Sequence, residues 1–127
     1  MQDKPSAEQL IAAVAEFLRG TVLPAATGRI AYDVRVAINA LELSIREIGE
    51  AAGQEAAEHS RLRALVEADG PLAVLNRAFC AQLRSGALAL DTPGVADHLW
   101  QTTLGKLAVD QPNYAAYRAE ISAPPQQ

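Results

Sequence analysis

The sequence has a single cysteine, Cys80, and few aromatic residues, which make up 5% of its 127 positions. A lone cysteine excludes an internal disulfide, so we expect a protein of a reducing compartment and place it in the cytoplasm. The N-terminus carries an acidic residue early and lacks the apolar core of a signal peptide. No uninterrupted apolar run approaches about 18 residues, so the sequence predicts no membrane span.

Basic runs are also missing. The eleven Lys and Arg residues are scattered along a chain of net charge −4. Such a chain has no row of positive charge that could neutralise successive phosphates. We therefore expect no nucleic acid among its partners.

Motifs that carry catalysis or hold metals are absent as well. The sequence has no glycine-rich phosphate loop, no nucleophile elbow and no zinc-binding helix motif. His59 and His98 lie on the polar sides of their expected helices, and neither has a second ligand four residues later. Cys80 falls on an apolar helix face and is expected to be a small core residue. We therefore predict no catalytic residue, no metal and no cofactor. The lack of a catalytic motif favours a role other than catalysis, and an enzyme stays open as a third hypothesis.

The sequence is instead rich in helix-forming residues, with Ala and Leu dominant and 50% of positions apolar. Apolar residues recur with helical period between capping and breaking residues, and no strand alternation or hairpin turn occurs. This pattern predicts an all-α, single-domain antiparallel bundle over residues 1–121, followed by a flexible tail over 122–127. Five main helices are expected at about 6–23, 29–49, 54–68, 71–85 and 93–110, with a short sixth at about 113–121. The first of them ends either near Gly20 or, frayed, at Leu23, before Pro24.

A stripe of four polar residues distinguishes the segment 29–49. Apolar residues occupy two nearly opposite faces of this helix, and between them lie Arg35, Asn39, Glu42 and Arg46. A helix that is apolar on two sides is usually enclosed by neighbours, so we expect the stripe to be partly buried. Two interpretations remain open. The arginines hold an anionic ligand, or Glu42 pairs with both arginines in a structural network.

Asn76 is the other candidate, because it lies within the apolar arc of the helix 71–85. A buried asparagine needs hydrogen-bond partners. It either meets the stripe across a helix interface or bonds a loop. The predicted ligand-binding residues are thus Arg35, Asn39, Glu42, Arg46 and Asn76.

The helix 93–110 is apolar over about half its circumference, which is more than a peripheral helix of a monomer needs. Trp100, Tyr114 and Tyr117 add aromatic surface nearby, and aromatic residues are enriched at protein interfaces. We therefore expect this helix and the C-terminal segment to bind another protein, with a two-fold homodimer as the commonest arrangement. The apolar residues of this helix are Val95, Ala96, Leu99, Trp100, Thr103, Leu104 and Leu107.

Three stretches carry a resemblance: MQDKPSAEQLIAAVAEFLR, RVAINALELSIRE, and LNRAFCAQLRSG followed by TTLGKLAVDQPNY. Together they resemble a bacterial family of small helical proteins of unknown function. Members of that family are encoded beside an aminoglycoside-phosphotransferase-like kinase and an acyl-CoA dehydrogenase. The resemblance implies an accessory role linked to acyl-CoA metabolism, with one of those enzymes as partner, and it supplies no catalytic residues. The alternative function is a small-molecule binding domain whose anionic ligand is held by Arg35 and Arg46.

Overall fold

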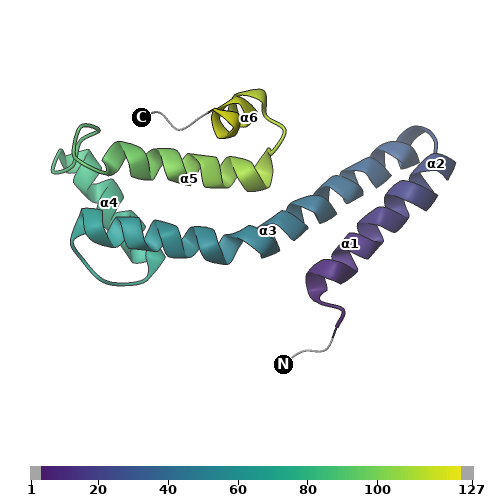
Figure 1. Cartoon of the computed structure of the whole chain (residues 1–127), viewed down its shortest axis with the longest axis horizontal. Helices are drawn as coiled ribbons and strands as arrows, with labels where there is room; N and C mark the ends of the chain where they lie inside the picture. Colours follow the sequence, from purple (N-terminus) through teal and green to yellow (C-terminus); the bar gives the residue numbers. More distant parts are fainter. Residues whose placement is uncertain (1–3, 124–127) are drawn as a thin grey trace. The chain divides into compact units, whose positions relative to one another are not determined.

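The computed structural model describes residues 4–123, and no strand occurs among them, which confirms the predicted all-α class (Figure 1). Of the predicted tail, residues 124–127 lie outside the described part. By its internal contacts the chain divides into two compact units, Met1–Ala51 and Ala52–Gln127, which are described in turn. The elements are α1 (Ala7–Phe17), the π-helical turn η1 (Leu18–Val22), α2 (Leu23–Ala25), α3 (Gly28–Val66), α4 (Leu72–Ser85), α5 (Val95–Asp110) and α6 (Ala115–Ser122).

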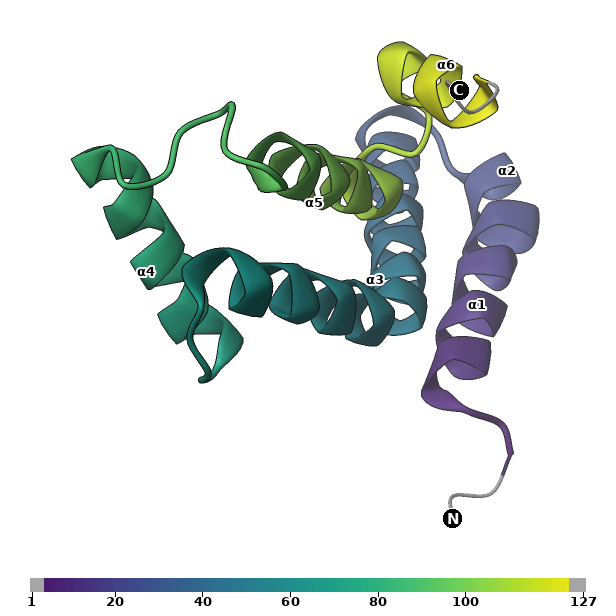
Figure 2. The ribbon, with the colours of Figure 1, turned by 60° about the vertical axis from the view of Figure 1, so that its left-hand side comes forward.

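The first unit is a helical hairpin, in which α1 and α2 lie antiparallel beside the first part of α3 (Figures 1 and 2). Ser6 caps α1 through a reciprocal pair of hydrogen bonds with Gln9. The chain stays helical past Gly20 through η1, where the amide of Leu23 donates to the carbonyl of Leu18. This wider turn directly precedes Pro24, which has no amide hydrogen to donate. The helical run therefore continues to Ala25, two residues beyond the expected end.

The expected break between helices at 29–49 and 54–68 is wrong, because α3 is one helix of 39 residues, Gly28–Val66. Gly49 and Gly53 lie inside it. Each glycine costs about 1 kcal/mol relative to alanine in a helix. The residues between and around them are mostly Ala and Glu, which favour helix, and continuing a formed helix is easier than starting a second one.

The second unit comprises the last part of α3 with α4, α5 and α6, and it contains the larger core. α3 ends where Glu67 adopts a left-handed conformation with φ of 53°, and an Arg63–Asp69 ion pair closes the turn that follows. α4 lies between Pro71 and Gly86, as predicted, and Gly86 ends it with φ of 78°. The short closing helix is also confirmed, as α6. The core consists of Leu62, Val66, Leu75, Phe79 and Val95.

Helix α5 is rotated relative to the sequence expectation. Its buried residues are Val95, His98 and Val109, whereas Leu99 and Trp100 are 40% and 49% exposed. A Cβ atom at position 105 would lie 3.2 Å from Oε1 of Gln54 on α3, so the side of α5 that approaches α3 is the one carrying Gly105. The prediction that His98 lies on a polar side is therefore wrong.

Cys80 is exposed, which overturns its predicted place in the core. The buried side of α4 is centred on Leu75 and Phe79, and Cys80 projects about 100° from Phe79 around the helix axis. Separately, no helix within residues 4–123 combines the length and apolar character needed to cross a lipid bilayer.

Candidate functional site

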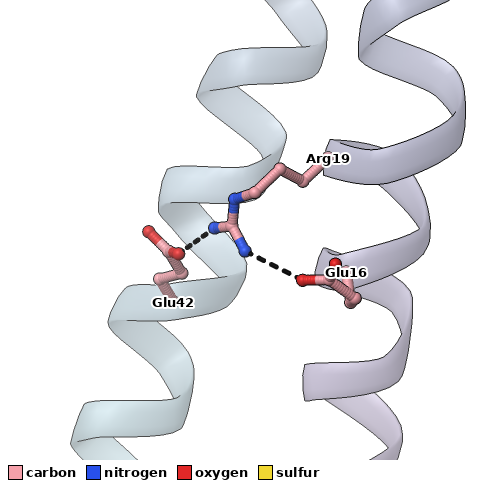
Figure 3. A network of polar contacts seen from close by, with 3 residues as sticks. All are labelled: Glu16, Arg19 and Glu42. Atoms are coloured by element: carbon pink, nitrogen blue, oxygen red, sulfur yellow. Dashed lines mark hydrogen bonds and ion pairs between the residues drawn. The ribbon is translucent and has the colours of Figure 1, made fainter.

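The polar side of the hairpin is built around Arg19, which the sequence analysis did not select. Its guanidinium group lies between two carboxylates, Glu16 one turn earlier and Glu42 on α3 (Figure 3). The Arg19 Nη1 to Glu16 Oε2 distance is 3.3 Å. The side chains of Arg19 and Glu42 are 44% and 40% exposed. Glu42 thus has a partner on the neighbouring helix. The spacing of Glu16 and Arg19 reveals only the local pair, because contact with Glu42 depends on how the hairpin closes.

Three of the four stripe residues come together beside this ion pair. They line an open depression of about 340 Å³. Arg46 is not among its lining residues. Arg35 and Asn39 are exposed, while Glu42 and Arg46 are half-buried. The lining residues are Arg19, Leu23, Arg35, Ile38, Asn39 and Glu42.

The stripe is less enclosed than its two-sided apolar pattern suggests. Ile38, on one apolar face of α3, is buried. On the opposite face Val36 and Leu43 are 48% and 38% exposed, so this face is not covered. In the depression Glu42 already neutralises Arg19, and Arg35 with Asn39 presents one cation and one amide to solvent. Such a surface binds an anion weakly at most, because exposed charge pairs gain little in water.

A second polar cluster lies in the other unit, and sequence reasoning missed most of it. It joins Glu58 and Arg61 on α3, Asn76 on α4, and His98 and Thr102 on α5. Asn76 Nδ2 donates to Glu58 Oε1 at 2.9 Å, and Arg61 Nη2 donates to Thr102 Oγ1 at 3.5 Å. The predicted Asn76 therefore bonds a neighbouring helix within its own unit. A helix-surface pattern alone cannot reveal this set, because its members are polar and come from three helices.

His98 is the most buried member of this cluster, with 2% of its surface exposed. Its ring packs edge-on against Phe79, with centroids 4.9 Å apart and an interplanar angle of 74°. Burial lowers the pKa of His98, and the nearby Arg61 charge lowers it further, while Glu58 and Asp97 act in the opposite direction. The imidazole is therefore held neutral near pH 7.

Two atoms of this cluster are buried without a hydrogen-bond partner among the described residues, Nε of Arg61 and Nδ1 of His98. The cluster ties α3, α4 and α5 together by polar contacts across their packed faces. It presents no carboxylate pair or nucleophile–base pair, and Cys80 lies on an exposed side of α4. Within residues 4–123, no group of three or more His, Cys, Asp or Glu side chains is placed to hold a metal ion.

The fold and the two polar clusters describe a small all-helical protein whose polar contacts join neighbouring helices. The chain belongs to a family described as a domain of unknown function, DUF6285, whose model matches residues 24–114. The match spans α3, α4 and α5 with both polar clusters except Arg19 and Glu16, which precede it. It confirms membership of a family of unknown function. No curated protein and no solved structure matches the chain.

Proposed function

We propose that this chain is a non-catalytic accessory protein of acyl-CoA metabolism that binds its partner through the outward face of α5. The observation that carries the proposal is the rotation of α5. Of its predicted apolar arc Val95 is buried in the core, but the large side chains of Leu99 and Trp100 are left at the surface. Large apolar residues gathered at a surface are typical of protein interaction sites.

The outward face of α5 is centred on Leu99 and Trp100, which are neighbours in the chain and both largely accessible. Ala96 and Thr103 are exposed on the same side of the helix. Tyr114, at the start of α6, is 51% exposed. A tryptophan flanked by smaller apolar groups is the composition that dominates binding energy in measured interfaces.

The resemblance described above supports the identity of the partner. It points to the acyl-CoA dehydrogenase or the phosphotransferase-like kinase encoded beside genes of such bacterial proteins. In this proposal the protein is cytoplasmic and meets one of these enzymes there. The alternative, an anion held by Arg35 and Arg46, needs one enclosed pocket containing both guanidinium groups. The open depression lined by Arg35 without Arg46 favours the interaction role instead.

The test is direct binding of the purified chain to each of the two purified enzymes. Trp100 is the only tryptophan of the chain, so labelling it with a fluorinated indole gives a signal that reports docking at this face. We expect Trp100→Glu to weaken binding at least tenfold. Gln101→Glu adds the same charge at the next exposed position of the helix and leaves binding unchanged.

Two results would overturn the proposal. One is the absence of a complex with either enzyme. The other is equal binding by the wild-type chain and Trp100→Glu, which would show that the outward face of α5 is not the docking site.

A further inference from the structure

The hairpin of the first unit has a second exposed apolar surface, which is separate from α5. On α1, Leu10, Val14 and Phe17 are each exposed over half of their surface or more, and on α3 Ile30 and Ile48 are 65% and 49% exposed. Ala37 lies between these two isoleucines and is also exposed. We call these six residues the apolar flank: Leu10, Val14, Phe17, Ile30, Ala37 and Ile48.

The six residues lie on one side of the hairpin. The buried residues Ala15, Ala31 and Ile38 mark the contact between α1 and α3. At about 100° per residue, the Arg19–Glu42 ion pair lies on one side of that contact. At about 100° per residue, the flank residues of each helix project to the other side of the contact. Two antiparallel helices turn in opposite senses when viewed from one end. The flank residues of α1 and those of α3 therefore lie on the same side of the hairpin.

Most of the charged side chains of the hairpin lie away from the flank. The charged residues of α1 and η1, Glu8, Glu16 and Arg19, all project toward the polar side. On α3, Asp33 lies between Ile30 and Ala37, three residues after the first and four before the second, and it pairs with Arg29 at 3.1 Å. The flank is therefore apolar except for one neighbouring ion pair, which carries no net charge.

The spacing along both helices is that of a helix-packing seam. Leu10, Val14 and Phe17 are separated by four and three residues, and Ile30 and Ala37 by seven. These are the intervals at which side chains of one helix interlock with those of another. Two antiparallel helices with a shared apolar side form half of a four-helix bundle.

We propose that two copies of this chain pair through the apolar flank, and that their two hairpins form an antiparallel four-helix bundle. A two-fold interface brings each surface against itself, so a patch with an excess of one charge would repel its copy. The one charged pair beside the flank, Arg29 and Asp33, carries no net charge. The small side chain of Ala37 lets the two hairpins approach closely. This dimer is independent of the enzyme-binding role proposed above, because it uses a different surface.

The test is the molar mass of the full chain in solution, measured by light scattering over a concentration series. We expect the wild-type chain to have twice the mass of one chain and Ala37→Glu to have the mass of one. Ala40→Glu makes the same change on the same helix, but on the face that carries Val36 and Leu43, and it stays dimeric. Circular dichroism verifies that the variants keep their helices, and Val14→Glu on α1 repeats the test from the other half of the flank.

A monomeric wild-type chain would overturn the proposal, and so would an Ala37→Glu variant that remains a dimer. Loss of the dimer in Ala40→Glu but not in Ala37→Glu would place the interface on the opposite face of α3 and would equally overturn it. Trp100→Glu serves as the control for independence. It loses enzyme binding and keeps the dimer mass, so failure of one proposal is distinguishable from failure of the other.

Discussion

The two units of this chain differ in how much of their apolar surface is buried. In the second unit Leu62, Leu75 and Val95 are almost completely inaccessible, and three helices surround them. In the hairpin of the first unit the buried residues are small or few, Ala15, Ala31 and Ile38, and about half of the large apolar side chains are exposed. Two packed helices have too little surface in common to enclose a core of their own.

The comparison shows that apolar content and core formation are separate properties. The hairpin is as apolar as the second unit along its helices, yet one of its sides faces outward. Burial of polar side chains also differs between the two units, in the same direction as burial of apolar ones. The ion pair of Arg19 and Glu42 is at the surface of the hairpin, whereas His98 is enclosed in the second unit.

The largest expected difference between the units is in the cost of removing an apolar side chain. Leu75→Ala removes a side chain that is 1% exposed, and we expect it to lower the free energy of unfolding by about 2–5 kcal/mol. Val14→Ala, on the half-exposed flank, should cost about 1 kcal/mol or less when measured on the monomeric Ala37→Glu background. Urea denaturation measures both. Equal costs would contradict the contrast between an enclosed core and an open flank.

We expect the free energy of unfolding to depend on pH through His98, a residue of the second unit. The pKa of His98 is lowered in the folded chain, so between the folded and unfolded values the unfolded chain binds more protons. Stability is therefore fully present above the unfolded pKa near 6.5 and decreases as the pH falls below it. We expect a lower free energy of unfolding at pH about 5.5 than at pH about 7.5.

The control for that prediction is His98→Gln, which removes the titrating group and should flatten the dependence over this interval. An identical pH dependence in the two proteins would show that His98 is not its source.

A smaller effect tests the continuity of α3 between the two units. Gly49 and Gly53 are helical, and a Cβ atom at either position meets no atom within 4 Å. We expect Gly49→Ala and Gly53→Ala each to stabilise the protein by about 0.5–1 kcal/mol, measured by thermal unfolding. Gly94→Ala is the contrasting control, because φ is +88° there and Leu65 Cδ2 lies 3.2 Å from the new Cβ, and it should destabilise. Destabilisation by Gly49→Ala would mean that the helix is interrupted.

The smallest effect is expected at the polar side of the hairpin. Glu42→Ala removes a partner of Arg19 from a pair that is partly exposed on both sides, so the cost should be under about 1 kcal/mol and should shrink with added salt. Thermal melts with and without phosphate or acyl-CoA complete the test. A rise in melting temperature that depends on the added anion and on Arg35 would favour the ligand-binding alternative.

The sequence predicted helix positions well where local signals decide them. As expected, α4 begins directly after Pro71 and ends directly before Gly86, and the short closing helix exists as α6. The sequence prediction was wrong at Gly49 and Gly53. Glycine there suggested the end of a helix, but α3 continues because the flanking Ala and Glu residues favour helix. A breaking signal competes with its neighbours, and their sum decides the outcome.

The candidate sites were harder to predict because their contacts join different helices. Arg35, Asn39 and Glu42 do share a depression, but Arg19 reaches Glu42 only when the hairpin closes. The burial of His98 follows from the orientation of α5, in which the side carrying Gly105 lies close to Gln54 of α3. Hydrophobic periodicity and helix propensity describe one helix at a time. They do not predict which side of that helix packs against a neighbouring helix.

Amide hydrogen exchange of the full chain at increasing protein concentration tests the central contrast most directly, because it reports on both units in one experiment. We expect protection of residues in α1 and the first part of α3 to rise with concentration, as the open hairpin gains a second copy. Protection around Leu62, Leu75 and Val95 should stay constant. Protection of the hairpin that is independent of concentration, at levels equal to the second unit, would contradict the proposal that the hairpin is completed by association.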